Sequence, residues 1–311
     1  MTKKQIVLAN PRGFCAGVHR AIATVEKAIE MYGSPVFVRH EIVHNKRVVD
    51  DLKEKGAIFV QELSEIPDDA VAIFSAHGVS EAIEKEAKTR GLTTIDATCP
   101  LVSKVHKQAK KYEAEGYTIV LIGHDGHPEV EGTKGRIKKA YIVSSAEDVY
   151  SLNKGEIGYK VAYITQTTLS MDDTKDVVEA LKETFPNVKG SSDICYATQS
   201  RQNAVKELAK QVDILLVVGS KNSSNSNRLR DLGDKMKIPS YLVDDVSQLK
   251  TAYFDEKKSI GITAGASAPA ILVEEIIAYL NEKFNVENIK TIEGIEENIK
   301  FKLPIIDKKS S

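Results

Sequence analysis

One cysteine lies in each third of the 311-residue chain: Cys15, Cys99 and Cys195. After each cysteine the sequence runs in the same order, through a helical stretch and an apolar strand to a loop of polar residues. These loops hold candidate ligand-binding side chains 29, 28 and 28 residues after the cysteines: His44, His127 and Ser223. Segments that repeat both their elements and their reactive residues predict three equivalent lobes.

A second polar loop follows a second apolar strand in each third. It contributes side chains 62, 68 and 72 residues after the cysteines: His77, Thr167 and Ser267. Three lobes that face one centre would bring three thiolates together within a ring of imidazole, hydroxyl and amide groups. That combination predicts a metal cluster beside a polar, anionic ligand.

The cysteines alone allow two interpretations. Free cysteines are among the most buried residue types, so three of them could be small core residues. Their shared position in front of a predicted helix favours reactivity instead, because the amide dipoles at a helix N-terminus stabilise a thiolate. Thiolates suit Zn²⁺ and iron–sulfur clusters, and three of them leave one metal position open for a reactant.

The polar loops have the composition of an anion site. Residues 165–170, 219–227 and 265–269 are rich in Ser, Thr, Asn or small residues and precede predicted helices. Hydroxyls and free helix N-terminal amides bind phosphate well, although the same residues also serve as simple helix caps. Glu129 or Glu131, close to His127, could supply protons in such a site, and spacing does not choose between them.

The composition is that of an ordinary soluble protein, with 42% hydrophobic and 28% charged residues. A net charge of −1 gives no electrostatic reason to expect nucleic acid or an anionic membrane as a partner. Without a long apolar run or a signal-peptide pattern, we expect a cytoplasmic protein whose cysteines are not a disulfide framework. Neither GxGxxG nor GxxxxGK[ST] occurs, so no dinucleotide or Walker-type site is indicated.

Ten short runs rich in β-branched residues predict strands: 5–10, 36–40, 57–60, 70–76, 118–123, 140–145, 160–166, 213–220, 240–245 and 259–265. Apolar residues at helical spacing predict helices over 21–33, 48–56, 104–116, 174–185, 202–211 and 269–280. Alternating strands and helices predict an α/β fold of mostly parallel sheets. In such sheets ligands bind at the carboxyl ends of the strands, where the polar loops lie.

We place lobe boundaries just before the second and third cysteines. This divides the chain into lobes at 1–96, 97–192 and 193–283, followed by a C-terminal tail at 284–311. The tail does not continue the repeat. We expect it to pack back on the body and to fray at its last residues, DKKSS.

Nine motifs in order along the chain closely resemble those of the 4-hydroxy-3-methylbut-2-enyl diphosphate reductases, the LytB/IspH-type family: NPRGFCAGV, VRHEIVHN, FSAHGVS, DATCPLV, GHPEVEG, TQTTLS, DICYAT, VVGSKNSSNSNRL and TAGASAP. The resemblance covers the chain from about residue 5 to residue 303. It implies a three-lobed, trefoil-like α/β fold around a central cavity. It also implies an oxygen-sensitive 4Fe–4S cluster held by three cysteines.

The activity that the resemblance implies is the last step of the methylerythritol phosphate route to isoprenoids. An allylic alcohol diphosphate loses its hydroxyl in a two-electron, two-proton reduction that gives isopentenyl and dimethylallyl diphosphate. Ferredoxin or flavodoxin would deliver the electrons singly. No nucleic acid or membrane partner is implied.

The resemblance also implies the residues of the site. The cluster ligands would be Cys15, Cys99 and Cys195, with the apical iron left open to the substrate. The diphosphate would be held by His44, His77, Ser223, Ser224, Asn225 and Ser267. Glu129 would be the proton donor rather than Glu131, His127 would lie near the diphosphate and help to relay protons, and Thr167 would hydrogen-bond the substrate hydroxyl.

Two other classes of protein fit part of the pattern. A zinc hydrolase acting on a phosphorylated substrate could use the same three cysteines with an open water position. A cluster-bearing sensor or carrier would need no turnover, and its polar loops would be helix caps. The concentration of His, Glu and Ser-Ser-Asn at strand ends argues against the sensor.

Overall fold

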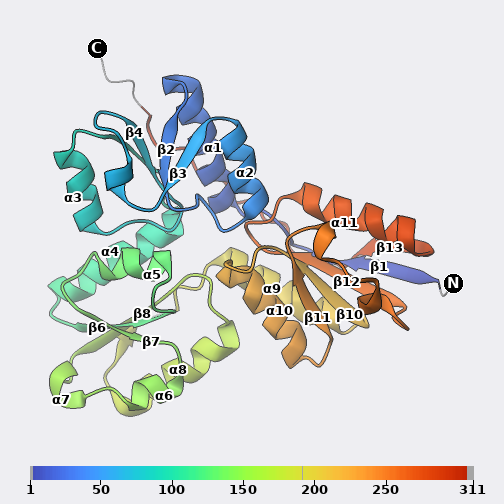
Figure 1. Cartoon of the computed structure of the whole chain (residues 1–311). Helices are drawn as coiled ribbons and strands as arrows, with labels where there is room; N and C mark the ends of the chain where they lie inside the picture. Colours follow the sequence, from blue (N-terminus) through green and yellow to red (C-terminus); the bar gives the residue numbers. More distant parts are fainter. Residues whose placement is uncertain (1–2, 191, 307–311) are drawn as a thin grey trace. The chain divides into compact units, whose positions relative to one another are not determined.

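Strands and helices alternate along most of the chain in the computed structural model, which describes residues 3–190 and 192–306 (Figure 1). The strands form one five-stranded and two four-stranded sheets, and every pairing between described strands is parallel. A strand overlaps each of the ten runs expected from the sequence, and a helix overlaps each of the six expected ranges, with ends that differ by one or two residues in most cases. The predicted α/β fold with parallel sheets is confirmed.

The five-stranded sheet combines the first strand with strands from the last third of the chain. Its order is β11 (Ser240–Val243), β10 (Ile214–Val218), β12 (Ser259–Ala264), β1 (Lys4–Leu8) and β13 (Val286–Thr291). Helix α11 (Ala270–Lys283) packs on one face, while α9 (Tyr196–Ala209) and α10 (Ser224–Lys235) pack on the other. Two short 3₁₀ turns, Val246–Gln248 and Thr251–Phe254, follow β11. Because helices cover both faces, the central strands β10 and β12 are buried along their whole length.

The second sheet has the order β3 (Ala57–Val60), β2 (Val36–Arg39), β4 (Val71–Phe74) and β5 (Thr93–Asp96). Helix α1 (Ala16–Tyr32) leads into β2, and α2 (Lys46–Glu54) connects β2 to β3. Helix α3 (Glu81–Thr89) and the 3₁₀ turn Leu63–Glu65 pack on this sheet against Phe37 and Phe74. The loop after β4, which carries His77, therefore leads directly into α3.

The third sheet has the order β7 (Ala140–Val143), β6 (Thr118–Ile122), β8 (Val161–Thr165) and β9 (Lys189–Gly190). Helices α4 (Pro100–Ala114) and α5 (Pro128–Lys134) cover one face. Helices α6 (Ala146–Tyr150) and α8 (Met171–Thr184) cover the other, with the short α7 (Lys154–Ile157) before β8. The loops with Glu129 and Thr167 follow β6 and β8, which are neighbours in this sheet.

The chain forms two compact units, and each is described by itself. Among the described residues, the first contains 3–19, His44–Asp50 and Tyr196–Lys300; the second contains Arg20–Val43, 51–190, 192–195 and 301–306. Strand β1 pairs with β12 and β13, so the first strand and part of the tail lie in the sheet of the first unit. The lobe boundaries at residues 97 and 193 stay a prediction, and the expected fraying of residues 307–311 lies outside the described residues.

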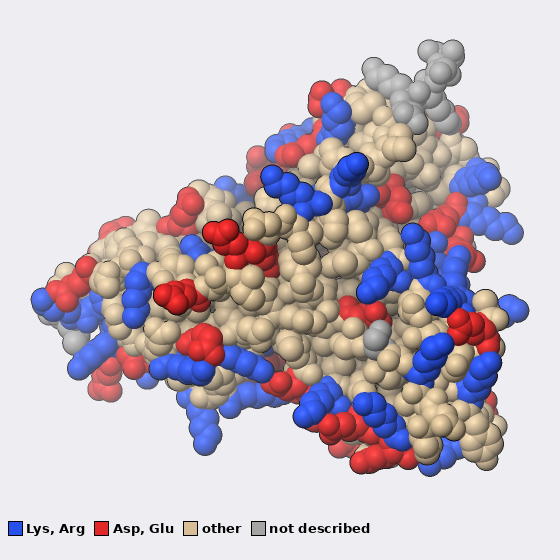
Figure 2. All heavy atoms as spheres, turned by 180° about the vertical axis from the view of Figure 1, so that it is seen from behind, with Lys and Arg blue, Asp and Glu red and all other residues tan. Residues whose placement is uncertain are grey.

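Charged side chains of both signs are interspersed over the face drawn in Figure 2, as the near-neutral composition leads one to expect. Within residues 3–190 and 192–306, no helix has the length and apolar character that crossing a membrane requires.

Candidate active site

Each cysteine is held in place by the same backbone hydrogen bond. The amides of Cys15, Cys99 and Cys195 donate to carbonyl groups in the loops after β12, β4 and β8, over distances of 3.2, 3.0 and 3.0 Å. The accepting residues are Ala266, Ala76 and Thr167, each two residues beyond the end of its strand. The equivalence of the three cysteine positions therefore extends from the sequence to the local backbone.

A second hydrogen bond extends this pattern two residues before each cysteine. The amides of Gly13 and Ala97 donate to the carbonyls that end β12 and β4. At the third position, the Asp193 amide donates instead to the Thr165 hydroxyl at the end of β8, over 2.8 Å. Each cysteine thus continues a strand ladder and then opens helix α1, α4 or α9.

The three thiols are half-buried, and none of them forms a disulfide. Among the residues that the structure describes, no three His, Cys, Asp or Glu side chains form a group suited to a single metal ion. Cys15 belongs to the first unit, whereas Cys99 and Cys195 belong to the second. The three cysteines share one backbone geometry, and three thiol groups are a set of ligands suited to iron–sulfur or zinc chemistry.

The first set of polar loops also has a common geometry. His44, His127 and Ser223 each lie five residues after the end of the preceding strand, β2, β6 or β10. His127 and Ser223 are the N-cap residues of α5 and α10, while α2 begins two residues after His44. The regular spacing read from the sequence therefore corresponds to one kind of strand–loop–helix connection.

In the second set of polar loops, the position of Thr167 differs by one residue from the equivalence that the sequence predicted. His77 and Ser267 lie three residues beyond the ends of β4 and β12, but Thr167 lies two residues beyond the end of β8. Its carbonyl accepts from the cysteine amide, as those of Ala76 and Ala266 do. The positional equivalent of His77 and Ser267 is thus Thr168, and Thr167 occupies a position of its own.

In the second unit the structure brings Glu129 and Thr167 together. Glu129 Oε1 accepts the Thr167 amide at 2.7 Å, and Oε2 accepts the Thr167 hydroxyl at 2.9 Å. Both side chains are buried. Glu131, by contrast, is about half exposed and lies 3.9 Å from the Lys134 ammonium. The geometry therefore supports Glu129 over Glu131 as the carboxyl that takes part in chemistry.

Burial raises the pKa of Glu129 to about 7, because the charged form is poorly solvated there. The two hydrogen bonds from Thr167 act in the opposite direction, and the charge of Asp193 adds a further increase. Asp193 itself has a raised pKa, again chiefly through burial. Sequence reasoning missed Asp193, although its place two residues before Cys195 was visible in DICYAT.

His127 and His77 are also brought together in this unit. Their rings meet edge to face with centroids 5.9 Å apart. Nδ1 of His127 accepts the Glu129 amide at 3.2 Å, so the proton of the neutral ring lies on Nε2. Nδ1 of His77 lies 3.2 Å from the Ser75 hydroxyl. Each imidazole is therefore oriented by a partner at Nδ1.

Gln166 is a residue that sequence reasoning missed, although it lies inside TQTTLS. It is buried, and its side-chain oxygen accepts the His124 amide at 3.1 Å while its nitrogen donates to the Thr168 hydroxyl at 3.0 Å. Gln166 thus joins the loop after β6 to the loop after β8. The first of these loops leads into the α5 turn that carries Glu129, and the second carries Thr167.

In the first unit, the N-terminus of α10 presents the Ser-Ser-Asn sequence. Ser223 caps the helix, with its hydroxyl accepting the Ser226 amide at 3.3 Å and the Ser226 hydroxyl at 3.0 Å. Ser224 is the first helical residue. Asn225 is buried, and neither its amide oxygen nor its amide nitrogen has a hydrogen-bond partner among the described residues. A buried amide without partners is costly to the free protein, which is typical of a group reserved for a ligand.

His44 and Ser267 are brought together in the same unit. The Ser267 hydroxyl donates to the His44 carbonyl at 2.9 Å, and Nδ1 of His44 lies 3.5 Å from the side-chain nitrogen of Asn222. The Lys46 amide donates to the Ser220 hydroxyl at 3.2 Å. The loop after β2 is thereby hydrogen-bonded to the loops after β10 and β12. Asn222 was not singled out from the sequence, where one Asn among several polar loop residues gives no signal.

Tyr196, directly after Cys195, is a further residue that the sequence did not single out. Its hydroxyl oxygen is buried and has no hydrogen-bond partner in the part of the chain that the structure describes. Burial raises its pKa to about 12, and the charge of Cys15 nearby adds to the increase. The Tyr196 phenol is therefore neutral at physiological pH.

Comparison with protein families matches residues 6–281 to the family described as "LytB protein". The chain is 55% identical over 309 residues to a protein of Acinetobacter baumannii (strain AYE) named 4-hydroxy-3-methylbut-2-enyl diphosphate reductase, with 96% of each chain covered. A protein of the same name from Salmonella paratyphi C is 55% identical over 306 residues, again with 96% of each covered.

Two solved structures are also similar. The E-1-hydroxy-2-methyl-but-2-enyl-4-diphosphate reductase of Plasmodium falciparum superposes with a TM-score of 0.93 at 39% identity, over 97% of this chain and 96% of that one. A structure titled as (E)-4-hydroxy-3-methyl-but-2-enyl diphosphate reductase, the terminal enzyme of the non-mevalonate pathway, gives a TM-score of 0.65 at 33% identity, over 91% and 100%. Matches of this identity and coverage show that the chain belongs to the LytB protein family.

Proposed function

We propose that this protein is a 4-hydroxy-3-methylbut-2-enyl diphosphate reductase. The reaction converts the allylic alcohol, two electrons and two protons into isopentenyl or dimethylallyl diphosphate and one water. The observation that carries the proposal is the buried Glu129 carboxyl, bonded through both oxygens to Thr167 in a chain whose relatives carry this name. Those relatives are reductases, so the zinc hydrolase that the sequence left open has no support.

The cofactor in this proposal is a 4Fe–4S cluster with Cys15, Cys99 and Cys195 as ligands. The three thiols fit such a group because they share one backbone geometry and each precedes a helix, where amide dipoles stabilise negative charge on sulfur. When bound, a cluster of this type supplies electrons one at a time and a Lewis-acidic iron that no cysteine occupies. Ferredoxin or flavodoxin is the proposed electron donor.

For the diphosphate we propose His44, His77, Ser223, Ser224, Asn225 and Ser267 as binding residues. Asn225 has a buried amide with a donor and an acceptor unused in the described structure. The first turn of α10 adds backbone amides that favour an anion. A phosphate oxygen would give the Asn225 amide nitrogen a partner that the described residues do not supply.

Glu129 is the proposed proton donor. With a pKa of about 7, a substantial fraction of the carboxyl holds a proton at neutral pH. A proton on Oε2 can be directed at the Thr167 hydroxyl 2.9 Å away, and that hydroxyl can then donate onward to the substrate oxygen. His127 is the proposed proton relay near the diphosphate. Its Nδ1 accepts the Glu129 backbone amide, so the neutral ring carries its proton on Nε2.

The experiment is an oxygen-free turnover assay with a reduced viologen dye and the allylic diphosphate, followed by product analysis. Formation of both isoprenoid diphosphates, with one substrate consumed per two electrons, is the expected result. Release of inorganic phosphate or diphosphate without dye oxidation would replace the reductase with the hydrolase.

A further inference from the structure

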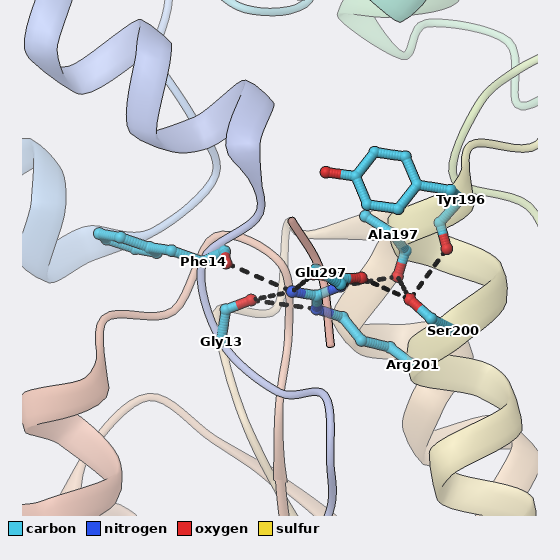
Figure 3. A network of polar contacts seen from close by, with 7 residues as sticks. All are labelled: Gly13, Phe14, Tyr196, Ala197, Ser200, Arg201 and Glu297. Atoms are coloured by element: carbon cyan, nitrogen blue, oxygen red, sulfur yellow. Dashed lines mark hydrogen bonds and ion pairs between the residues drawn. The ribbon is translucent and has the colours of Figure 1, made fainter. Parts of the chain in front are cut away.

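Figure 3 shows a buried ion pair that joins helix α9 to the segment after β13. Arg201 has no exposed side-chain surface, and Glu297 is only 15% exposed. The guanidinium binds the carboxylate with both terminal nitrogens, Nη1 to Oε1 at 2.9 Å and Nη2 to Oε2 at 3.1 Å. A buried arginine is tolerated only when its donors are well satisfied, so the remaining contacts of Arg201 are informative.

Apart from one hydrogen bond of Nη1 to the Ala197 carbonyl within α9, at 2.9 Å, those contacts are to the turn that leads into Cys15. Nε and Nη2 of Arg201 donate to the Gly13 carbonyl at 3.0 and 2.6 Å, and Nη2 also reaches the Phe14 carbonyl at 3.3 Å. Gly13 has a φ of +71°, the left-handed conformation that glycine adopts readily. Arg201 therefore holds the two peptide groups immediately before Cys15.

The segment that supplies Glu297 follows the same turn closely. The Ile292 amide donates to the Leu8 carbonyl at 3.0 Å, and a Cβ on Gly294 would lie 2.0 Å from the Asn10 carbonyl oxygen. The Ser200 hydroxyl donates to Glu297 Oε1 at 2.5 Å and so fixes the carboxylate against α9. The segment 292–297 thus runs along residues 8–14 in direct contact.

A similar arrangement occurs in the second unit. Nη1 of Arg20 donates to the Thr98 carbonyl, directly before Cys99, at 2.9 Å. Nε of the same guanidinium donates to the Lys302 carbonyl at 2.8 Å. In each unit an arginine therefore joins the residue before a cysteine to the C-terminal segment.

We propose that Arg201 and Arg20 are positioning residues for Cys15 and Cys99, and that the C-terminal segment from Ile292 to Lys302 acts as the clamp that holds both arginines in place. The inference rests on the proposed function only in taking the two thiols as cluster ligands. Its physical basis is that a charged donor fixes the peptide groups next to each cysteine. Loss of Glu297 would leave Arg201 buried without its counter-charge and would loosen the Cys15 turn selectively.

The test compares Glu297→Gln with Arg20→Gln in the full-length protein. A matched control is Glu287→Gln, which makes the same chemical change in β13 at an exposed ion pair with Lys3. Each protein is prepared without oxygen and treated with iodoacetamide, with and without an iron chelator. Mass spectrometry of the peptides then gives a separate labelling rate for each of the three cysteines.

For Glu297→Gln we expect the labelling rate of Cys15 to rise about tenfold relative to Cys195, while Cys99 stays unchanged. Arg20→Gln should raise the labelling rate of Cys99 by a smaller factor, because the contact of Arg20 to Lys302 is exposed. The labelling rate of Cys15 should stay unchanged in this variant. The control should match the wild type. Equal increases in the labelling rates of all three cysteines, or no increase in the rate of Cys15, would overturn the proposal. Arg201, Arg20 and Glu297 would then contribute to general stability only.

Ser200→Ala provides a milder change, should Glu297→Gln fail to fold. It removes one hydrogen bond to Glu297 without removing a charge. It should raise Cys15 labelling about threefold and leave the other two cysteines unchanged, and an unchanged Cys15 rate in this folded variant would also overturn the proposal. A protein that carries no iron would contradict the proposed function. The ratio of Cys15 to Cys195 labelling, measured without the chelator, would still show whether the segment from Ile292 to Lys302 acts as a clamp.

Discussion

Glu129 is bonded to Thr167 through both of its carboxylate oxygens, at 2.7 Å to the amide and at 2.9 Å to the hydroxyl. The bonds link the first turn of α5 to the loop after β8 within one unit. Burial and these bonds shift the carboxyl pKa in opposite directions, and burial dominates to give a value of about 7. The pair is therefore suited to proton exchange near neutral pH.

Replacing Glu129 with Gln should slow turnover by about 10²–10⁴-fold, since the amide keeps the shape of the side chain but cannot give up a proton in the same way. Binding of the diphosphate should change little, because Glu129 is not among the proposed phosphate-binding residues. Steady-state kinetics with the reduced dye gives both quantities. Glu131→Gln is the matched control and should keep near-wild-type turnover; a comparable loss there, or near-normal rates for Glu129→Gln, would rule out the assigned role.

Replacing Thr167 with Val should move the alkaline limb of the pH–rate profile to higher pH. The Thr167 hydroxyl stabilises the charged form of Glu129 and so lowers its pKa; removing that bond raises the pKa further. Turnover should also fall, because the path from the carboxyl to the substrate oxygen loses its hydroxyl. Thr167→Ser keeps the hydroxyl and should restore the wild-type profile. An alkaline limb that stays in place in the Val variant would show that Glu129 does not set it.

Thermal stability should depend on pH through Glu129 in a defined direction. Its folded-state pKa of about 7 exceeds the ordinary value of 4.5, so the stabilising effect of binding the proton is fully present below about pH 4.5 and is lost as the pH rises through 7. The shift corresponds to a loss on the order of 3 kcal/mol across that window. Melting temperatures between pH 5 and about pH 8 should fall more steeply for the wild type than for Glu129→Gln. Parallel curves for the two proteins would contradict the assigned pKa.

Replacing Asn225 with Leu should separate stability from ligand binding. The Asn225 amide is buried and has no hydrogen-bond partner within the described residues, so an apolar side chain of similar size should leave the melting temperature unchanged or raise it. Affinity for inorganic diphosphate, measured by calorimetry, should fall at least about tenfold if the amide binds phosphate oxygens.

Asn227→Ala offers the contrasting case on the same helix. Its side-chain amide already donates to the Lys221 and Ser223 carbonyls at 2.7 and 2.9 Å, and its loss should lower the melting temperature. A destabilised Asn225→Leu with unchanged diphosphate affinity would mean that Asn225 has a structural role only.

Much of the fold could be predicted because parallel sheets covered on both faces leave a plain pattern of apolar runs. The spacing of His44, His127 and Ser223 proved informative, since each lies at the same point of a strand–loop–helix connection. The second loops were less well matched. The distance along the chain from a cysteine cannot resolve an offset of one residue. The sequence therefore predicted Thr167 as the equivalent of His77 and Ser267, whereas Thr168 occupies that position.

Other features depend on contacts between distant parts of the chain. The pairing of β1 with β12 and β13 joins residues more than 250 positions apart, and strand patterns do not specify partners at such separations. Arg201 lies in the polar run TQSRQN and Glu297 in the charged run EGIEENIK, and both patterns by themselves indicate a solvated surface. Their burial becomes visible only when the turn before Cys15 is packed against both.

The most direct test of the account is a visible absorption spectrum of the protein purified without oxygen and reduced with dithionite, before and after addition of the allylic diphosphate. The account predicts iron and sulfide in the preparation, a broad visible absorption that bleaches on reduction, and its return when the substrate is added. Cys99→Ser should lack this absorption. A colourless protein that contains zinc, or a reduced chromophore that does not respond to the diphosphate, would contradict the central claim.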